Sequence, residues 1–403
     1  MIKLFIFFVL SLILIEFLIL ILFLNLKKNF QWLIGRKDIN PNFTKKKYKN
    51  FLKKNYDEVL GWDRKPSTKG FEKSNRKTYF KINKFGSRGK EKYNKTFLSV
   101  FGDSFAFCRY VNDNETWQYH LSKKNKKNVL NYGVGNYGLD QAFLKYLRYN
   151  KILKNQKIIF CIVPETIARI SSYWKHYREF GNIFGIKPII KIKKNQINLI
   201  KIPNFKISNL LKNTLEFDND FINKTKKIDI FYNKKLKKNL FIFSYLFCFM
   251  KNFKNNSKIF YFLLMDKLSK KVDKKYKNKY YNDACSQILE QNIRESHLYY
   301  EGLFFKKNLK NLLKYMEYYF KKNKIDFSIL IVPTYYDLKL EKSRIKYISF
   351  YKSLNNSKII DLTEDILKFK NWSNYYFKNK LGGHLNKSGN YFLADIINKK
   401  ISK

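Results

Sequence analysis

The chain has 403 residues, of which 82 are lysine or arginine and 31 are aspartate or glutamate, so its formal net charge is +51. Hydrophobic residues make up 45% of it and aromatic residues 18%. This composition excludes a disordered chain, a collagen-like fibre and a disulfide-stapled miniprotein. The length suffices for one large hydrophobic core or two modest ones.

The excess lysine is spread through every segment, including predicted turns and the last residues of the chain. A nucleic-acid surface would gather basic residues on one face and favour arginine. We therefore interpret the charge as a bias of the whole composition and expect no specific nucleic-acid partner. The alternatives are adhesion to an anionic lipid or polysaccharide, and nucleic-acid binding.

The four cysteines form no C-x-x-C pair and have no histidine nearby at metal-ligand spacing. They are Cys108, Cys161, Cys248 and Cys285. We expect neither a metal site nor a disulfide framework from them.

The first segment of the chain is apolar enough to enter a membrane. Leu4–Leu26 is 23 residues long, and its only polar residues are Ser11, Glu16 and Asn25. That length spans a bilayer core. We predict an uncleaved, single-pass transmembrane anchor over residues 1–28, with a long signal peptide as the alternative. The flanking charges leave the side of the membrane open, and a periplasmic or otherwise extracytoplasmic soluble domain is one of the two arrangements.

Residues 29–95 are polar and rich in turns, and they are predicted to lead into the core, with a strand at Thr78–Asn83. From 96 to 183, short apolar runs alternate with helical patterns. The predicted strands are Phe97–Phe101, Val129–Tyr132 and Ile158–Val163, and the predicted helices are Glu115–Lys124 and Gln141–Lys151. Such alternation indicates a parallel sheet and the first half of an α/β core.

The same alternation resumes over residues 301–403. The predicted helices there are Leu309–Lys322, Ser343–Leu354 and Asn390–Lys399, and the predicted strands are Phe327–Val332 and Lys358–Asp361. Residues 184–300 do not fit the pattern. They contain a predicted hairpin, Ile189–Ile192 with Ile197–Ile202, and two apolar runs too short to cross a bilayer, Leu240–Met250 and Ile259–Met265. We interpret this region as an insertion that forms a cap or a partner surface.

Three clusters of small and polar residues stand beside predicted strands or before the last helix. They are Phe101-Gly102-Asp103-Ser104-Phe105, Asn131-Tyr132-Gly133-Val134-Gly135-Asn136-Tyr137-Gly138 and Gly382-Gly383-His384-Leu385-Asn386. Open parallel sheets bind ligands outside the carboxyl ends of their strands, so these clusters are expected to meet.

Ser104 and His384 are the candidates for nucleophilic chemistry. A serine hydroxyl is a weak nucleophile until a base takes its proton, and neutral imidazole suits that task. Two glycines precede His384 and allow its loop to approach closely. Main-chain amides of the glycine-rich second cluster would hold an oxyanion.

In this order the motifs FGDSF, NYGVGNYG and GHLNKSGN resemble the SGNH/GDSL hydrolase superfamily, over about residues 97–182 and 304–403. The resemblance implies an α/β three-layer sandwich with a mostly parallel, flavodoxin-like sheet, and ester chemistry without a metal or organic cofactor. It implies Ser104 as the nucleophile and one oxyanion amide, Gly135 or Asn136 as the second amide, and His384 as the base.

Two positions depart from the family's pattern. Where the family carries Asn after the third strand, this chain has Val163-Pro164-Glu165-Thr166, so Thr166 replaces the oxyanion donor or the donor is missing. Where the family carries Asp three residues before the histidine, this chain has Leu381. The histidine would then be oriented by Asp361, by Glu165 or by a backbone carbonyl, or the site is a Ser–His dyad.

Asp103, Glu165 and Arg169 are the expected substrate-binding residues. Arg169 and the run Trp174-Lys175-His176-Tyr177 follow the third strand, where a charge and a stacking ring would bind a sugar or an anionic substrate. Packing inside the cap is the alternative for the aromatic run.

Gly133-x-Gly135-x-x-Gly138 also matches the dinucleotide-binding fingerprint. That fingerprint requires an acidic residue about 20 positions further on, at the end of the next strand. Lys157–Val163 contains none.

We therefore predict a membrane-anchored serine ester hydrolase or acyltransferase, acting on a small acyl ester or an acylated surface glycan. One alternative is a catalytically degenerate protein of the same fold that binds a glycan or serves in assembly. The other is a dinucleotide-binding protein.

Overall fold

The computed structural model describes residues 1–24, 40–74, 76–153, 157–179, 181–193, 195–236, 244–272, 279–356, 358–377 and 382–401. The chain divides into two compact units. The first comprises Met1–Phe51, Ser172–Ile186 and Pro203–Gln291, and the second comprises Leu52–Ser171, Lys187–Ile202 and Asn292–Lys403. The domain limits expected from the sequence stay a prediction.

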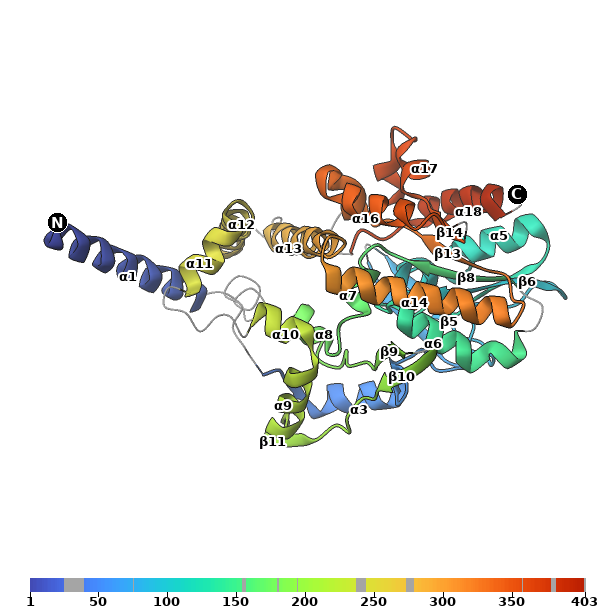
Figure 1. Ribbon diagram of the computed structural model, residues 1–403, viewed down its shortest axis with the longest axis horizontal. Coiled ribbons are helices and arrows are strands. Elements are labelled where there is room, and N and C mark those ends of the chain that lie inside the picture. Colours follow the sequence, from blue (N-terminus) through green and yellow to red (C-terminus); the bar gives the residue numbers. More distant parts are fainter. Residues whose placement is uncertain are drawn as a thin grey trace. The chain divides into compact units, whose positions relative to one another are not determined.

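The second unit is built on a five-stranded parallel sheet with strand order β14-β13-β8-β6-β7. Figure 1 labels β14, β13, β8 and β6. The strands are β6 (Thr96–Gly102), β7 (Asn128–Asn131), β8 (Lys157–Ile162), β13 (Phe327–Ile331) and β14 (Ile359–Asp361). Each coincides with a predicted strand to within a residue or two, so the predicted parallel sheet is confirmed. The FGDSF motif stands at the carboxyl end of β6, and Val163-Pro164-Glu165-Thr166 follows the neighbouring strand β8.

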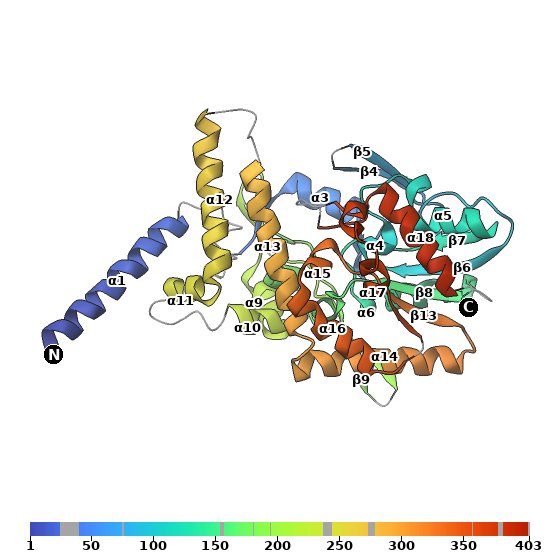
Figure 2. The same cartoon turned by 90° about the horizontal axis from the view of Figure 1, so that it is seen from above.

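Helices cover both faces of this sheet. They are α5 (Trp117–Asn125), α6 (Leu139–Tyr149), α14 (Leu303–Lys322), α16 (Glu341–Ser353) and α18 (Lys387–Ile401). Leu98 and Val100 of β6 share one core with α5 and α18, which lie side by side in Figure 2. Phe101 points to the opposite face, because successive strand residues alternate, and packs on Tyr146 of α6. On that face the ring of Phe160 in β8 packs on the ring of Phe320 in α14, with centroids 5.7 Å apart. The unit is thus mixed α/β.

Antiparallel hairpins add to the second unit; besides the short pair β2 (Tyr56–Asp57) with β3 (Gly61–Trp62), the described residues form two longer ones. They are β4 (Lys69–Lys73) with β5 (Lys77–Lys81), and β9 (Ile189–Lys193) with β10 (Gln196–Ile200). The predicted strand at Thr78–Asn83 and the predicted isoleucine-rich hairpin are both present. Helix α14 begins six residues before its predicted start. Its first turn buries Phe305, but Leu303 and Phe304 are exposed, and the polar run Lys306-Lys307-Asn308 interrupts the apolar pattern before Leu309.

The first unit contains the N-terminal helix and a small antiparallel sheet. The sheet has the order β1-β12-β11, with β1 (Asn42–Thr44), β11 (Ile207–Leu211) and β12 (Thr214–Phe217). Trp174 is fully buried against Phe217 and Phe221, the latter in helix α9 (Asn219–Ile228). The aromatic run that begins at Trp174 therefore packs inside this unit.

Helix α1 (Ile2–Leu24) is long and apolar enough to span a membrane or to act as a signal sequence. Its Glu16 accepts hydrogen bonds from the N–H groups of Tyr245 and Leu246, at 2.8 and 2.7 Å, at the start of α11 (Ser244–Lys251). The carboxylate thereby caps the positive end of that helix. Most of the predicted apolar run at Leu240–Met250 is this helix, and residues 237–243 lie outside the described ones.

Candidate active site

Ser104 and His384 are in hydrogen-bond contact, although 280 positions separate them in the sequence. The Oγ atom of Ser104 lies 2.8 Å from Nε2 of His384. Ser104 opens the short helix α4 (Ser104–Phe107) directly after β6, and His384 stands in the loop before α18. The side chains are 4% and 9% exposed, so the pair is largely shielded from water.

Glycine is required next to the imidazole. Gly382 and Gly383 have φ angles of +71° and +62°, which disfavour side chains with a Cβ. A Cβ at Gly383 would lie 2.8 Å from Cβ of Tyr335, in helix α15 (Tyr335–Lys339), and one at Gly382 would lie 2.9 Å from Cε1 of His384. The two glycines thus let the loop bring the imidazole down to the sheet edge.

Aromatic rings hold the imidazole in place. Phe105 stacks on it with ring centroids 5.0 Å apart and an interplanar angle of 22°. Tyr110 meets it edge-on at 5.5 Å. These contacts restrict the ring's orientation.

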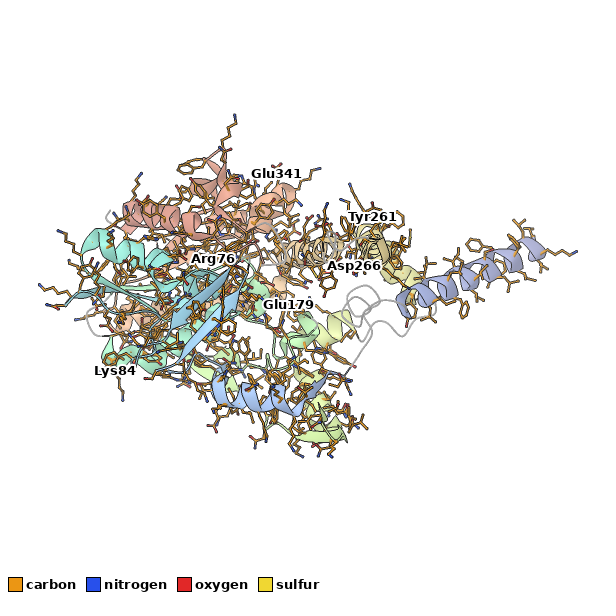
Figure 3. All side chains as sticks on the ribbon, turned by 180° about the vertical axis from the view of Figure 1, so that it is seen from behind. Arg76, Lys84, Glu179, Tyr261, Asp266 and Glu341 are labelled. Carbon is orange, nitrogen blue, oxygen red and sulfur yellow. The ribbon has the colours of Figure 1, made fainter. Side chains whose placement is uncertain are left out.

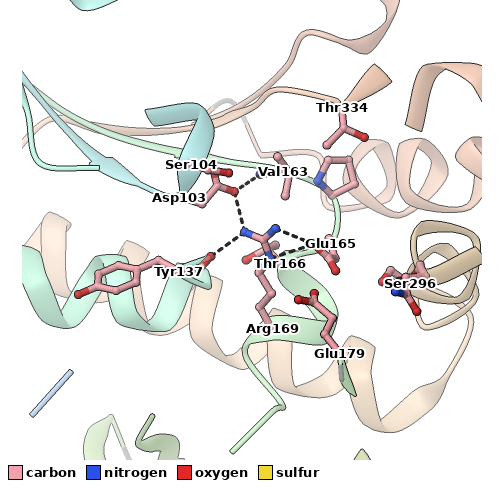
Figure 4. Close-up of polar contacts among 12 residues, drawn as sticks. Asp103, Ser104, Tyr137, Val163, Glu165, Thr166, Arg169, Glu179, Ser296 and Thr334 are labelled. Atoms are coloured by element: carbon pink, nitrogen blue, oxygen red, sulfur yellow. Dashed lines mark hydrogen bonds and ion pairs between the residues drawn. The ribbon is translucent and has the colours of Figure 1, made fainter. Parts of the chain in front are cut away.

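Asp103 is an internal anchor. It is 0% exposed and accepts a hydrogen bond from the N–H of Phe105 at 2.8 Å. It also accepts from the N–H of Val163 at 2.9 Å and from Nη1 of Arg169 at 3.2 Å, as Figure 4 shows. Burial raises the pKa of Asp103, while Arg169 and the two N–H groups oppose that rise. The residue ties the end of β6 to the end of β8 and so fixes the backbone of the adjacent Ser104.

Arg169 and Glu165 belong to the same internal network. The Arg169 guanidinium contacts the Glu165 carboxylate at 2.6 and 3.0 Å and the carbonyl of Tyr137 at 3.1 Å, as Figure 4 shows. Its side chain is only 8% exposed. The structure brings together the three residues expected to bind substrate. The guanidinium of Arg169 forms ion pairs with the carboxylates of Asp103 and Glu165.

The backbone around Gly135 lies at the same edge of the sheet. Gly133 packs so closely on α4 that a Cβ there would lie 2.2 Å from the Phe107 nitrogen. Beyond it, Gly135 and Asn136 are partly exposed, and Asn136 has φ +70°. Among the described residues, no hydrogen-bond acceptor is found for the N–H groups of Ser104, Gly135 and Asn136. These amides are available to a bound oxyanion.

Thr166 takes a place that the sequence did not indicate. It is fully buried, and its hydroxyl accepts a hydrogen bond from the N–H of Leu139 at 2.9 Å, at the first residue of α6. Its own N–H donates to the carbonyl of Val163 at 3.0 Å. Thr166 thus caps α6, and its role as an oxyanion donor stays a prediction.

Asp361, the last residue of β14, is hydrogen-bonded to a neighbour in the sequence. Its carboxylate accepts hydrogen bonds from the Thr363 N–H at 2.9 Å and the Thr363 hydroxyl at 2.6 Å. Burial raises its pKa. Within the described ranges, no hydrogen bond joins Asp361 to His384, and Leu381 lies outside them.

A second Ser–His–Asp contact chain was not anticipated from the sequence. Nε2 of His297 lies 2.7 Å from Oδ1 of Asp337, and Nδ1 lies 2.8 Å from Oγ of Ser343. The other Asp337 oxygen accepts the Thr334 N–H at 2.7 Å and caps α15. The T-x-x-D spacing is a readable capping signal, but nothing near His297 in the sequence indicates its partners. His297 is 0% exposed. Its contacts with Asp337 and Ser343 join the end of α13 (Lys279–Leu298) to α15 and α16.

The glycines of the dinucleotide-like motif serve internal packing. A Cβ at Gly138 would lie 2.5 Å from Oδ1 of Asp140, and Gly133 approaches α4 as described above. Both glycines are explained without a bound pyrophosphate.

No protein-family model matches the chain, and no curated protein matches it. One solved structure that aligns with it is a protein of Desulfitobacterium hafniense DCB-2 whose name assigns it to the G-D-S-L family of lipolytic proteins. The sequence identity is 20%, and the TM-score is 0.16. The alignment covers 17% of this chain and 39% of the other, so a similarity of this extent decides neither fold nor function.

Proposed function

We propose that this protein is a membrane-anchored serine hydrolase of the SGNH type that cleaves or transfers acyl groups of esters. The observation that carries the proposal is the 2.8 Å contact between Ser104 Oγ and His384 Nε2 at the carboxyl ends of the central strands. Main-chain amides without an acceptor among the described residues lie at the same edge of the sheet, and helix α1 is long and apolar enough to serve as a membrane anchor.

In the proposed reaction, Oγ of Ser104 attacks the carbonyl carbon of the ester while its proton passes to Nε2 of His384. The carbonyl oxygen becomes an oxyanion that accepts hydrogen bonds from the N–H groups of Ser104 and Gly135. The carbon–oxygen ester bond then breaks, and the imidazolium returns the proton to the leaving alcohol. Water, or the hydroxyl of a sugar, releases the acyl group from Ser104 by the reverse sequence. The chemistry requires no metal or organic cofactor.

Hydrolysis of 4-nitrophenyl acetate by the full chain in detergent micelles tests the proposal. We expect turnover that falls by at least about 10³-fold in Ser104→Ala and in His384→Gln. Ser388→Ala and His120→Gln, which remove an exposed serine and a histidine that packs on Tyr391 of α18, should retain it. Equal turnover in wild type and Ser104→Ala would refute the serine mechanism. A folded wild type without any turnover would favour the non-catalytic glycan-binding protein.

A further inference from the structure

A cluster of arginines adjoins the candidate nucleophile and carries more positive than negative charge. The N–H of Arg109 donates to the carbonyl of Ser104 at 3.2 Å, so this arginine is fixed one turn beyond the nucleophile. Its Cδ is the nearest atom, at 3.9 Å, to where a Cβ on Gly135 would stand. The side chain therefore runs along the turn whose amides are unbonded.

Glu72 is the one carboxylate that both Arg109 and Arg64 face among the described residues. It accepts hydrogen bonds from Nε of Arg109 and from the N–H of Tyr110, each at 2.9 Å, and it lies 3.5 Å from Nη2 of Arg64. A carboxylate of 8% exposure thus holds Arg109 and, through Tyr110, the ring that packs on His384. One negative charge neutralises only one of the two guanidinium groups.

The third arginine of the cluster is already satisfied. Arg88 pairs with Asp113 at 2.7 Å and donates to the carbonyls of Phe107, Cys108 and Val111. In contrast, Nη1 and Nη2 of Arg109 have no hydrogen-bond acceptor within the described part of the chain. Arg64 lies with its guanidinium over the rings of Phe80 and Phe107, which accept no ordinary hydrogen bond.

Burial and the neighbouring charges shift the pKa of Arg64. Burial lowers the pKa of Arg64 to about 10; Glu72 and, less strongly, Asp63 oppose that lowering, while the neighbouring Arg109 and Arg88 add to it. The group is still a cation at neutral pH. A guanidinium that is partly buried, under-neutralised and short of acceptors is a ready partner for an anion, which it can bind through two parallel N–H donors.

We propose that Arg109, with Arg64 behind it, forms a subsite for an anionic group of the ester substrate. The group is a carboxylate, a sulfate or a phosphate, carried on the acyl part or on the alcohol part of the ester. This inference rests on the proposed function, and it narrows the substrate from any ester to an acidic one.

Two matched pairs of substrates test the subsite and locate the charge. Mono-4-nitrophenyl glutarate and neutral 4-nitrophenyl pentanoate differ in the acyl part, and 4-acetoxybenzoate and neutral 4-acetoxybenzamide differ in the alcohol part. For the full chain in detergent, we expect kcat/KM to favour the anionic member of one pair by about 10-fold or more. Arg109→Gln should remove that preference mainly through KM, read as the ratio of the anionic to the neutral ester within each variant, while Arg109→Lys keeps part of it.

Lys84→Gln is the control for net charge. Lys84 is exposed and is labelled in Figure 3, and its loss removes the same charge as Arg109→Gln away from the nucleophile. Equal kcat/KM for both members of both pairs, or a loss in Lys84→Gln equal to that in Arg109→Gln, would overturn the subsite. The neutral esters report on the proposed function alone, so the two failures are distinguishable.

Calorimetric titration with glutarate gives a readout that needs no turnover. Wild type and Lys84→Gln should bind the dianion, and Arg109→Gln should bind it at least about 10-fold more weakly. If wild type binds no more tightly than Arg109→Gln, the subsite is refuted even where no ester is cleaved.

Discussion

At the scale of single residues, the candidate site depends on buried charges that hold backbone segments in place. Asp103 anchors the nucleophile's turn, Glu165 and Asp103 share Arg169, and Glu72 holds Arg109 and the N–H of Tyr110. Such groups are stabilising only while they are ionised and paired, since an unpaired buried charge is costly. Stability near the site should therefore depend on pH.

Glu72 gives this dependence a definite sign. Burial alone would raise its pKa, but Arg109, the N–H of Tyr110 and Arg64 bring it below the model-peptide value of 4.5. A lowered pKa in the folded state means that the stabilisation is complete above pH 4.5 and is lost as the pH falls through the lowered value. Urea unfolding of Glu72→Gln and wild type from pH 3 to 7 measures it.

We expect Glu72→Gln to be less stable than wild type by about 1–3 kcal/mol above pH 5, the usual range for hydrogen bonds to a buried charged group. The difference should shrink as the pH falls below 4.5. A difference that is constant with pH, or that grows on acidification, would contradict the assigned pairing.

At the scale of secondary-structure elements, the alternation of strands and helices was predictable, because the apolar pattern that indicates each element lies within a short stretch of the sequence. The five strands of the sheet were all located from short apolar runs, and parallel pairing followed from the helices between them. The start of α14 was not, because the polar run Lys306-Lys307-Asn308 separates the one buried residue of its first turn, Phe305, from the rest of the apolar stripe.

The candidate site was predictable only in part. Ser104 and His384 stand in recognisable local motifs, so their meeting could be expected although no local rule links residues 280 positions apart. The pairing of Glu72 with Arg109 has no such motif, and 37 positions separate the two. The capping of α6 by Thr166 likewise depends on how two loops meet in space.

The contact between His297 and its partners belongs to this scale because it joins three helices. Replacing His297 by Gln leaves the buried Asp337 without its imidazole partner, at an expected cost of about 2–4 kcal/mol. Ser343→Ala removes one hydrogen bond to a half-buried hydroxyl, for about 0.5–1.5 kcal/mol. Chemical unfolding measures both.

Ester turnover per folded chain should be unchanged in both variants, because this second Ser–His–Asp chain has its imidazole closed to solvent. Turnover lost in Ser343→Ala but kept in Ser104→Ala would reverse the assignment of the active serine.

At the scale of the whole molecule, two features bear on how the protein has to be handled. Glu16 of α1 caps α11, so removal of the N-terminal helix leaves two N–H groups of the first unit without their acceptor. The full chain in detergent is therefore the proper sample. The net charge of +51 also makes loose binding of anions a background, which is why charge-matched variants are needed.

The most direct measurement is the intact mass of the full chain after exposure to a fluorophosphonate, followed by peptide mapping. We expect one adduct per chain, on Ser104, formed at least about 100-fold more slowly in His384→Gln and at the wild-type rate in His120→Gln. A folded chain that forms no adduct, that reacts at another serine, or that reacts equally fast without the His384 imidazole would contradict the assignment of Ser104 and His384 as nucleophile and base.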